Sequence, residues 1–207
     1  MPDSLPFDGM RFRPLTVGDL PLLGRWLSHG GALEWYSFGV PPTAEEVSRK
    51  YLPRILGDEP VDGHILELAG ANAGCFQSYL LEDFPDYPAV PCADRAAGID
   101  FFLAEEYAGR GLGPRAIRAY VQEAVFAQPG VFECWADPDP RNLRSVRALQ
   151  RAGFSPVTKT AAKDAILMRI PRDEALRDAT RPEGAFPGRH DPGRDPYTLF
   201  TDPLGEP

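Results

Sequence analysis

Residues 98–115, GIDFFLAEEYAGRGLGPR, constrain the fold more than any other part of the chain. An apolar run that holds a single acid, Asp100, is followed by three glycines within five residues and then by Pro114. Glycine permits the positive φ of tight turns, and proline is favoured in the first turn of a helix. The stretch therefore predicts a strand over 98–103, a glycine loop, and a helix that begins near Pro114.

Hydrophobic periodicity and capping residues predict the remaining elements. Helices are expected over 16–28, 43–57, 114–128 and 142–153, and strands over 64–69, 75–81, 98–103, 131–136 and 164–170. From residue 98 onward the order is strand, helix, strand, helix, strand, which implies a parallel pair with a right-handed crossover. The predicted fold class is α/β (α+β), with a mixed central sheet flanked by helices.

The length of 207 residues suits one well-packed domain, which we place at residues 1–171. Residues 172–207 are expected to form an irregular tail. Within them, residues 182–207 hold six prolines and four glycines among 26 residues and few aliphatic side chains. Such a composition does not support a packed core.

Charge and cysteine usage exclude several classes of function. The net charge of −8 argues against a protein that binds nucleic acid by neutralising phosphates. No stretch approaches the roughly 18 consecutive apolar residues of a membrane span. Cys75, Cys92 and Cys134 lack the spacing of a disulfide framework or a zinc site. We expect a soluble, cytoplasmic protein that binds no nucleic acid, membrane or metal.

The glycine loop has the composition of a cradle for a diphosphate. Without side chains, several N–H groups can converge on an anion at the positive end of a helix dipole. The spacing Gly-x-Gly-x-Gly differs from the dinucleotide fingerprint, and the Gly-Lys-Ser/Thr ending of the nucleoside triphosphate loop is absent. Taken alone, the loop is also compatible with a simple tight turn.

Two motifs together resemble the GCN5-related N-acetyltransferase (GNAT) superfamily. They are AGRGLG and, about thirty residues later, DPDPRNLRSVRALQRAGF. Along the chain, the segments EWYSF, YLPRIL, QSY, GID and ADPDPRNLR occur in an order and rough spacing similar to those of the aminoglycoside 6′-N-acetyltransferases. The resemblance covers residues 11 to about 170. It implies a twisted sheet with splayed parallel strands and acetyl-CoA as co-substrate.

The resemblance also implies which residues hold acetyl-CoA. The glycine loop would bind the pyrophosphate through backbone N–H groups and two arginines. The strand before the loop would pair with the pantetheine arm, and the residue that caps a later helix would form a hydrogen bond to the same arm. The residues are Phe102, Leu103, Gly109, Arg110, Gly111, Leu112, Gly113, Pro114, Arg115 and Asn142.

Asp100 is the predicted catalytic residue. An amine is protonated in water and needs a proton acceptor before it can attack a thioester, and similar enzymes carry an aspartate at this GID position. The resemblance further implies that Trp35, Asp100, Asp137 and Asp164 bind the acceptor. Residues 82–106 hold seven acids against one base, which favours a small cationic amine as substrate.

One position departs from the family pattern. Where the resemblance implies a tyrosine that protonates the CoA thiolate, this chain has Leu149, which cannot donate a proton. The siderophore N-acyltransferases, which act on lysine-type amines, share the loop and often carry an aliphatic residue there, but they typically have histidine in place of Asp100. A lysine-type acceptor therefore remains an alternative to an aminoglycoside 6′-amine.

Two further alternatives follow from the residues. The Cys134 thiol is a candidate for a covalent mechanism, although no histidine lies nearby in the sequence to activate it, so a structural cysteine is favoured. A non-catalytic acyl-CoA binding protein would also explain Leu149. The acidic surroundings of Asp100 favour an enzyme instead. The sequence leaves monomer and homodimer open.

Overall fold

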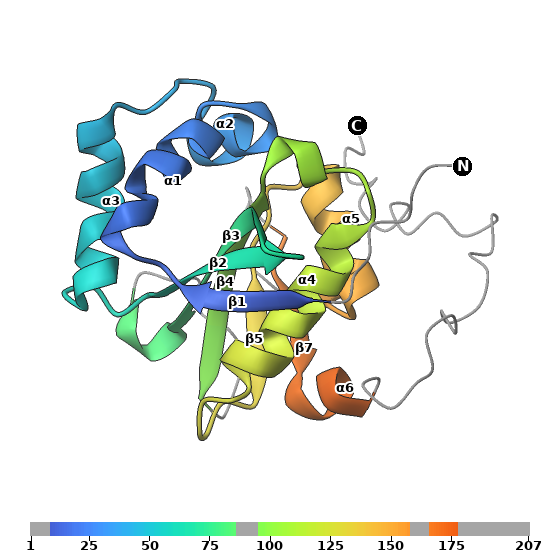
Figure 1. Ribbon diagram of the computed structural model, residues 1–207. Helices are drawn as coiled ribbons and strands as arrows, with labels where there is room; N and C mark the ends of the chain where they lie inside the picture. The colour runs from blue at the N-terminus through green and yellow to red at the C-terminus, as the bar shows by residue number, and fades with distance from the viewer. Residues whose placement is uncertain (1–8, 86–94, 158–165, 178–207) are drawn as a thin grey trace, which may run out of the picture.

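A seven-stranded mixed sheet forms the centre of the computed structural model (Figure 1), which describes residues 9–85, 95–157 and 166–177. Its strands are β1 (Met10–Pro14), β2 (Asp62–Leu68), β3 (Ala71–Leu80), β4 (Ala96–Leu103), β5 (Glu133–Ala136), β6 (Ser155–Pro156) and β7 (Met168–Pro171). The spatial order is β1-β2-β3-β4-β5-β7-β6, and β4–β5 is the parallel pair. The predicted α/β (α+β) class with a mixed sheet is confirmed.

Two groups of helices cover the sheet (Figure 1). They are α1 (Leu20–Leu27), α2 (Gly30–Tyr36) and α3 (Ala44–Leu56) on one side, and α4 (Leu112–Tyr120), α5 (Leu143–Ala152) and α6 (Arg172–Arg177) on the other. Short helical turns η1 (Val17–Asp19), η2 (Leu81–Asp83) and η3 (Glu105–Tyr107) precede or follow strands, and a π-helical turn, η4 (Val121–Val125), continues α4.

The helix ends form where capping residues predict them. At the start of α3, the Thr43 Oγ accepts the Glu46 N–H at 3.2 Å, and Glu46 bonds back to Thr43. The Asn142 side chain accepts the Ser145 N–H at 3.1 Å and caps α5. That helix ends at Gly153 with a φ of +105°, a conformation that favours glycine. The helices predicted over 43–57 and 142–153 are therefore confirmed.

The predicted hairpin is present as β2 and β3. The two strands are antiparallel and joined at Ala69 and Gly70, which both have positive φ. Such a two-residue turn matches the twist of the flanking strands. The hairpin places the hydrophobic side chains of β3 against both faces of the sheet, since residues alternate between faces along a strand.

Two hydrophobic cores lie on opposite faces of the sheet. The larger one contains residues of β4, β5, α4, α5 and α6, including the fully buried Leu112, Leu149 and Cys134. The other lies under α1–α3 and contains Phe102 and Cys75 from the sheet. The alternation of side chains along β4 therefore assigns Asp100 to the α1–α3 side, two residues before Phe102.

Several described elements were not predicted. They include the short turns η2 and η3, the strands β1 and β6, and the helices α2 and α6. The last of them occupies residues 172–177, so regular structure extends six residues into the segment expected to be an irregular tail. Ala175 is completely buried, and its carbonyl accepts bonds from Arg118 and Gln122. The remainder of that segment, 178–207, lies outside the described residues, as does the first part of the strand predicted over 164–170.

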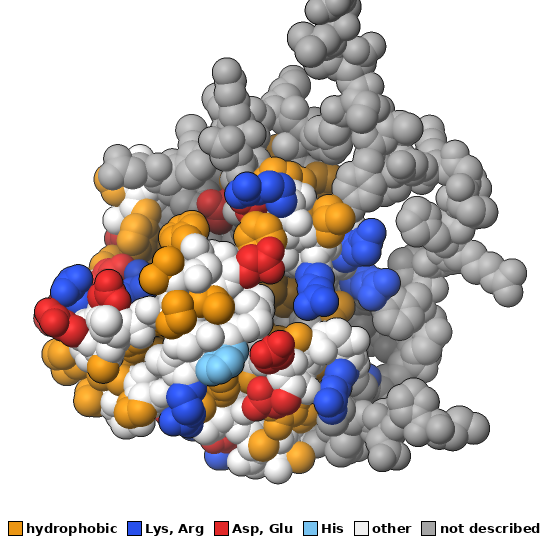
Figure 2. Space-filling view, turned by 90° about the horizontal axis from the view of Figure 1, so that it is seen from above, with side chains coloured by type: hydrophobic (Ala, Val, Ile, Leu, Met, Phe, Trp, Pro, Cys, Tyr) orange, Lys and Arg blue, Asp and Glu red, His pale blue; other side chains and the backbone are white. Residues whose placement is uncertain are grey.

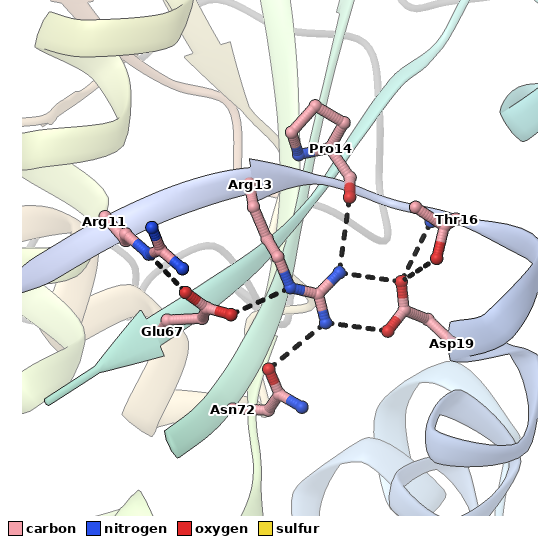
Figure 3. A network of polar contacts seen from close by, with 7 residues as sticks. All are labelled: Arg11, Arg13, Pro14, Thr16, Asp19, Glu67 and Asn72. Atoms are coloured by element: carbon pink, nitrogen blue, oxygen red, sulfur yellow. Dashed lines mark hydrogen bonds and ion pairs between the residues drawn. The ribbon is translucent and has the colours of Figure 1, made fainter. Parts of the chain in front are cut away.

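A partly buried charge network joins β1 to β2 and to η1 (Figure 3). The Arg13 guanidinium donates two hydrogen bonds to the Asp19 carboxylate at 2.7 and 2.8 Å. It also donates to Glu67 at 2.9 Å and to Asn72 at 3.2 Å. The hydrogen bonds from Arg13 hold the pKa of Asp19 at about 2. The network therefore fixes the direction in which the chain leaves β1 for α1.

No helix in the described ranges is long and apolar enough to cross a membrane.

Candidate active site

The parallel strands β4 and β5 separate before β4 ends. Residues 96–98 of β4 pair with residues 133–135 of β5. Beyond Gly98 the strand continues to Leu103, and no described strand pairs with 99–103 on that side. This segment therefore has an open edge, as expected from the splayed strands of the family that the sequence resembles.

Backbone polar groups along β4 alternate between β3 and the open edge. The Phe102 carbonyl faces β3, where it lies 2.5 Å from the position that a Cβ on Gly74 would take. The N–H and carbonyl groups of Phe101 and Leu103 therefore face the open edge. The ligand contact expected from the Phe102 backbone stays a prediction, and Phe101 joins Leu103 as a residue whose backbone groups face the open edge.

The Tyr36 hydroxyl occupies part of this open edge. It accepts the Phe101 N–H at 2.9 Å and donates to the Phe101 carbonyl at 2.7 Å. The Tyr36 ring packs edge-to-face against Phe102, with 5.2 Å between centroids. Burial, and secondarily the negative charge of Asp100, raise the pKa of Tyr36 well above its usual value. The phenol is therefore a protonated donor.

The glycine loop has the backbone of an open anion cradle. Gly109 and Gly111 have φ of +75° and +81°, and a Cβ on either would meet no atom within 4 Å. Their left-handed conformation favours glycine, and the space beside them is free. Gly111 caps α4, whose first N–H groups, those of Leu112 and Gly113, have no acceptor within a helix.

The other loop residues lie around this cradle. Arg110 and Arg115 are exposed, and Pro114 is in the first turn of α4. The side chain of Leu112 is fully buried, so this residue can offer only its backbone to a ligand. The loop can thus present N–H groups and two arginines to phosphates.

Two residues of the second motif have structural roles. The Asn142 side-chain oxygen caps α5, which leaves its NH₂ group to bind a ligand. Leu149 is fully buried in the larger core. Its side chain therefore contributes packing between α5 and the sheet.

Asp100 is partly buried on the face of the sheet that α1–α3 cover. It lies opposite Gln77 of β3 in the antiparallel register. Burial raises the pKa of Asp100 above its ordinary value, while the positive charges of Lys50 and Arg54 act in the opposite direction. A carboxylate whose pKa is raised toward neutrality accepts protons more effectively. The environment of Asp100 therefore suits a general base.

The two α3 cations beside Asp100 differ in how firmly they are held. Arg54 donates to the Glu59 carboxylate at 3.0 and 3.1 Å, and it also bonds the Gln77 side-chain oxygen. The Lys50 ammonium instead lies over the Tyr51 ring, 5.5 Å from its centroid. Arg54 is therefore fixed by three hydrogen bonds, whereas Lys50 is held by ring contacts.

The acids of residues 82–106 were expected to surround the acceptor, and the structure describes part of this segment. Glu82 pairs with Arg95 at 2.8 Å on the surface, and Asp86 and Asp94 lie outside the described residues. The face seen in Figure 2 mixes acidic, basic and hydrophobic side chains. The charges that act most on Asp100 are the α3 cations, which the expectation of an acidic acceptor site did not include.

A second carboxylate lies across the gap between the strands. Asp137 directly follows β5, and burial, together with the negative charge of Asp100, raises its pKa to about 6. Gly98 belongs to the last pair of residues before the strands separate, and the Tyr79 ring packs against it. A Cβ at residue 98 would lie only 2.4 Å from an atom of that ring. Asp100 and Asp137 therefore interact electrostatically at the point where the strands separate.

Trp35 lies on α2, and its ring contacts the turn before α5. The guanidinium of Arg141 lies over its ring, 6.0 Å from the centroid. A nearby hollow of about 260 Å³ is lined in part by Tyr36, Lys50 and Tyr51. Trp35 directly precedes Tyr36 in α2, and its ring contact is with the segment that follows β5. The fourth predicted acceptor residue, Asp164, lies outside the described residues.

Cys134 is buried in β5, and burial raises the pKa of its thiol. A buried, protonated thiol is a poor nucleophile, which supports the structural interpretation of this cysteine. The described part of the chain contains no group of three or more His, Cys, Asp or Glu side chains that could hold a metal ion.

The sequence-based reasoning missed four residues around Asp100: Tyr36, Lys50, Arg54 and Gln77. Tyr36 and Gln77 lie in the segments EWYSF and QSY, which the family resemblance includes, but neither segment assigns them a role. Lys50 and Arg54 share one face of α3, one turn apart, and this spacing is the signal that could have identified them as a pair.

Known proteins are similar in sequence to most of this chain. The family model described as an acetyltransferase (GNAT) domain matches residues 16–161. An aminoglycoside N(6′)-acetyltransferase type 1 from Klebsiella pneumoniae is 36% identical over 150 residues, which cover 71% of this chain and 74% of that protein.

Solved structures extend the similarity to three dimensions. A structure of the aminoglycoside acetyltransferase AAC(6′)-Ib in complex with coenzyme A has a TM-score of 0.71 and 34% identity, and the match covers 83% of this chain and 100% of that one. The same enzyme in complex with paromomycin and acetyl-CoA has a TM-score of 0.70 and 35% identity, with 85% and 99% covered.

Proposed function

Because the chain belongs to the GNAT acetyltransferase family, we propose that it transfers the acetyl group of acetyl-CoA to the 6′-amine of an aminoglycoside. The observation that carries the proposal is the position of Asp100, a partly buried carboxylate on the strand whose edge opens beside β5. The aminoglycoside acetyltransferases at 34–36% identity support the choice of acceptor.

The residues of the cradle and of the open edge fit acetyl-CoA. The positive φ and free surroundings of Gly109 and Gly111 suit the close approach of a pyrophosphate to the backbone. Arg110 and Arg115 would add charge, and the Leu103 backbone would pair with the pantetheine arm. When bound, acetyl-CoA supplies the acetyl group as an activated thioester.

Asp100 would accept the proton of the acceptor ammonium, directly or through one water. Its raised pKa makes it a stronger base than an exposed aspartate. Asp137 and Trp35 would hold the rest of the acceptor, since Asp137 directly follows β5 and the Trp35 ring contacts Arg141 of the same segment. A polycationic acceptor would also be attracted by the paired charges of Asp100 and Asp137.

Leu149 has no part in proton transfer in this proposal. A leucine side chain has no proton to donate, and this one is buried in the core, so the CoA thiolate leaves without a proton from this position. A thiol with an intrinsic pKa of about 8.5 is an adequate leaving group in its ionised form. The departure from the family pattern therefore affects the rate of the leaving-group step rather than the type of reaction.

The test is release of the CoA thiol with matched acceptors. Paromomycin carries a hydroxyl where neomycin carries the 6′-amine, so the two compounds differ at the proposed reactive group. We expect thiol release with neomycin and kanamycin and little above background with paromomycin. Mass spectrometry and NMR of the product then identify the acetylated amine.

Other outcomes contradict the proposal. Equal release with paromomycin would place the reaction at another amine. Release with lysine or N-hydroxylysine alone would favour the siderophore-type acceptor. Silence with every amine, despite measurable acetyl-CoA binding, would identify an acyl-CoA binding protein.

We place this reaction in a reducing, cytoplasmic setting, where acetyl-CoA is available. Cys75 and Cys134, the two cysteines in the described ranges, are unpaired and buried, which supports this placement.

A further inference from the structure

Lys50 brings a primary amine into the surroundings of Asp100. The chain contains three lysines, Lys50, Lys159 and Lys163, and Lys50 is the one within the described residues. Its ammonium lies over two aromatic rings, 5.5 Å from the centroid of Tyr51 and 5.7 Å from that of Tyr36. Lys50 also lines the 260 Å³ hollow.

The Tyr36 ring connects Lys50 to the open edge of β4. Its hydroxyl forms both hydrogen bonds to the backbone of Phe101, the residue after Asp100. The Lys50 ammonium therefore lies over the side chain that contacts the strand at the proposed reaction centre. The negative charge of Asp100 acts on Lys50, and the positive charge of Lys50 acts on Asp100.

The surroundings of Lys50 favour the reactive form of its amine. Burial, and secondarily the charge of Arg54, lower the pKa of Lys50 below its usual value. A neutral amine is the nucleophilic form. Among the described residues, no carboxylate forms an ion pair or hydrogen bond with Lys50, so its side chain can change rotamer without breaking one.

The neighbouring cation does not share these properties. The guanidinium of Arg54 remains protonated and is fixed by Glu59 and Gln77. Lys50 keeps more than a third of its surface exposed, which leaves its side chain room to move. Lys50 is therefore the less constrained cation of this pair and the one that carries a primary amine.

We propose that Lys50 is an internal acceptor, which the enzyme acetylates with its own acetyl-CoA when no acceptor amine is bound. The Lys50 nitrogen forms a bond to the thioester carbonyl carbon, the carbon–sulfur bond breaks, and CoA leaves as the thiolate. The proton lost by the amine passes to Asp100. The inference rests on the proposed acetyl transfer beside Asp100.

The test uses the full-length protein with isotopically labelled acetyl-CoA and no acceptor. Peptide mapping by mass spectrometry then gives the rate of labelling at each of the three lysines. We expect Lys50 to be labelled at least tenfold faster than Lys159 and Lys163. Saturating neomycin should suppress this labelling, and Asp100→Asn should slow it.

Arg49→Lys provides a matched control. Arg49 is the adjacent exposed residue of α3 and pairs with Glu45, so this variant adds an amine on the same helix away from Asp100. We expect no enhanced labelling at position 49 and unchanged turnover of neomycin. Lys50→Arg should abolish the fast labelling, because a guanidinium is not acetylated under these conditions.

Two results would overturn the inference. One is an unlabelled Lys50 in a preparation that acetylates neomycin, which would leave the proposed function intact. The other is labelling of Lys50 at the same rate as Lys159 and Lys163, unaffected by Asp100→Asn, which would indicate ordinary chemical acetylation. Loss of neomycin turnover with fast Lys50 labelling would instead refute only the proposed acceptor.

Discussion

The hydroxyl of Tyr36 is joined to the backbone of Phe101 by two hydrogen bonds, one accepted from its N–H and one donated to its carbonyl. A side chain from α2 thereby occupies the edge of β4 that would otherwise be open to a ligand. Any ligand that pairs with Phe101 has to displace this hydroxyl.

Tyr36→Phe should therefore strengthen acetyl-CoA binding. The variant keeps the ring contact with Phe102 and removes the group that competes for the Phe101 backbone. A hydrogen bond contributes about 1 kcal/mol, so we expect a Kd lower by roughly fivefold, with a similar loss of folding stability. Calorimetric titration and thermal unfolding measure the two effects. Weaker binding in the variant would mean that the hydroxyl contacts the co-substrate itself.

Gly111→Val should weaken acetyl-CoA binding, and Gly57 offers a matched control. Both glycines cap a helix, with φ of +81° and +82°, and a Cβ added to either would meet no atom within 4 Å. Valine at either place carries the same backbone strain, but only residue 111 lies in the phosphate cradle. We expect Kd to rise at least tenfold for Gly111→Val alone. Equal affinities in the two variants would place the cradle elsewhere.

Local chemistry made much of the fold predictable. Asn142 and Gly153 mark the two ends of α5 through side-chain capping and a left-handed residue, and both effects act within a few residues of the chain. In contrast, α2 begins with Gly30 and Gly31, which are poor helix formers, and its position depends on packing against the rest of the fold.

The candidate site was predictable only in part for the same reason. Asp100 could be identified because its strand and the glycine loop are contiguous in the sequence. The contact between Tyr36 and Phe101 joins residues 65 positions apart, and Lys50 approaches Asp100 from another helix. No local pattern indicates that α3 brings cations to a site predicted to be acidic.

Arg13→Gln should reduce stability in a pH-dependent way. Hydrogen bonds from Arg13 are the main reason that the pKa of Asp19 falls to about 2 from an ordinary value near 4, a shift equivalent to about 2 kcal/mol. This stabilisation is present above about pH 4 and is lost as pH falls toward 2. We therefore expect the difference in the free energy of unfolding between wild type and variant, measured with urea, to be largest above about pH 4 and to shrink toward pH 2.

Arg11→Gln is the control for this network. Arg11 also bonds Glu67, but 71% of its side chain is exposed, and surface ion pairs contribute less than about 1 kcal/mol. We expect a small loss of stability for Arg11→Gln. A difference for Arg13→Gln that stays constant from pH 7 to pH 2 would show that Asp19 titrates normally in the folded protein.

Asp100→Asn should separate catalysis from co-substrate binding. Asparagine keeps the size of the side chain but cannot accept the ammonium proton, so we expect turnover to fall about 100-fold or more with an unchanged Kd for acetyl-CoA. The same variant removes a negative charge that raises the pKa of Asp137, so that pKa should fall below about 6 in a carboxyl NMR titration. Full turnover in the variant would exclude Asp100 as the base. If the pKa of Asp137 stayed at about 6 while turnover fell, burial alone would account for that pKa, and the two carboxylates would act independently on the acceptor.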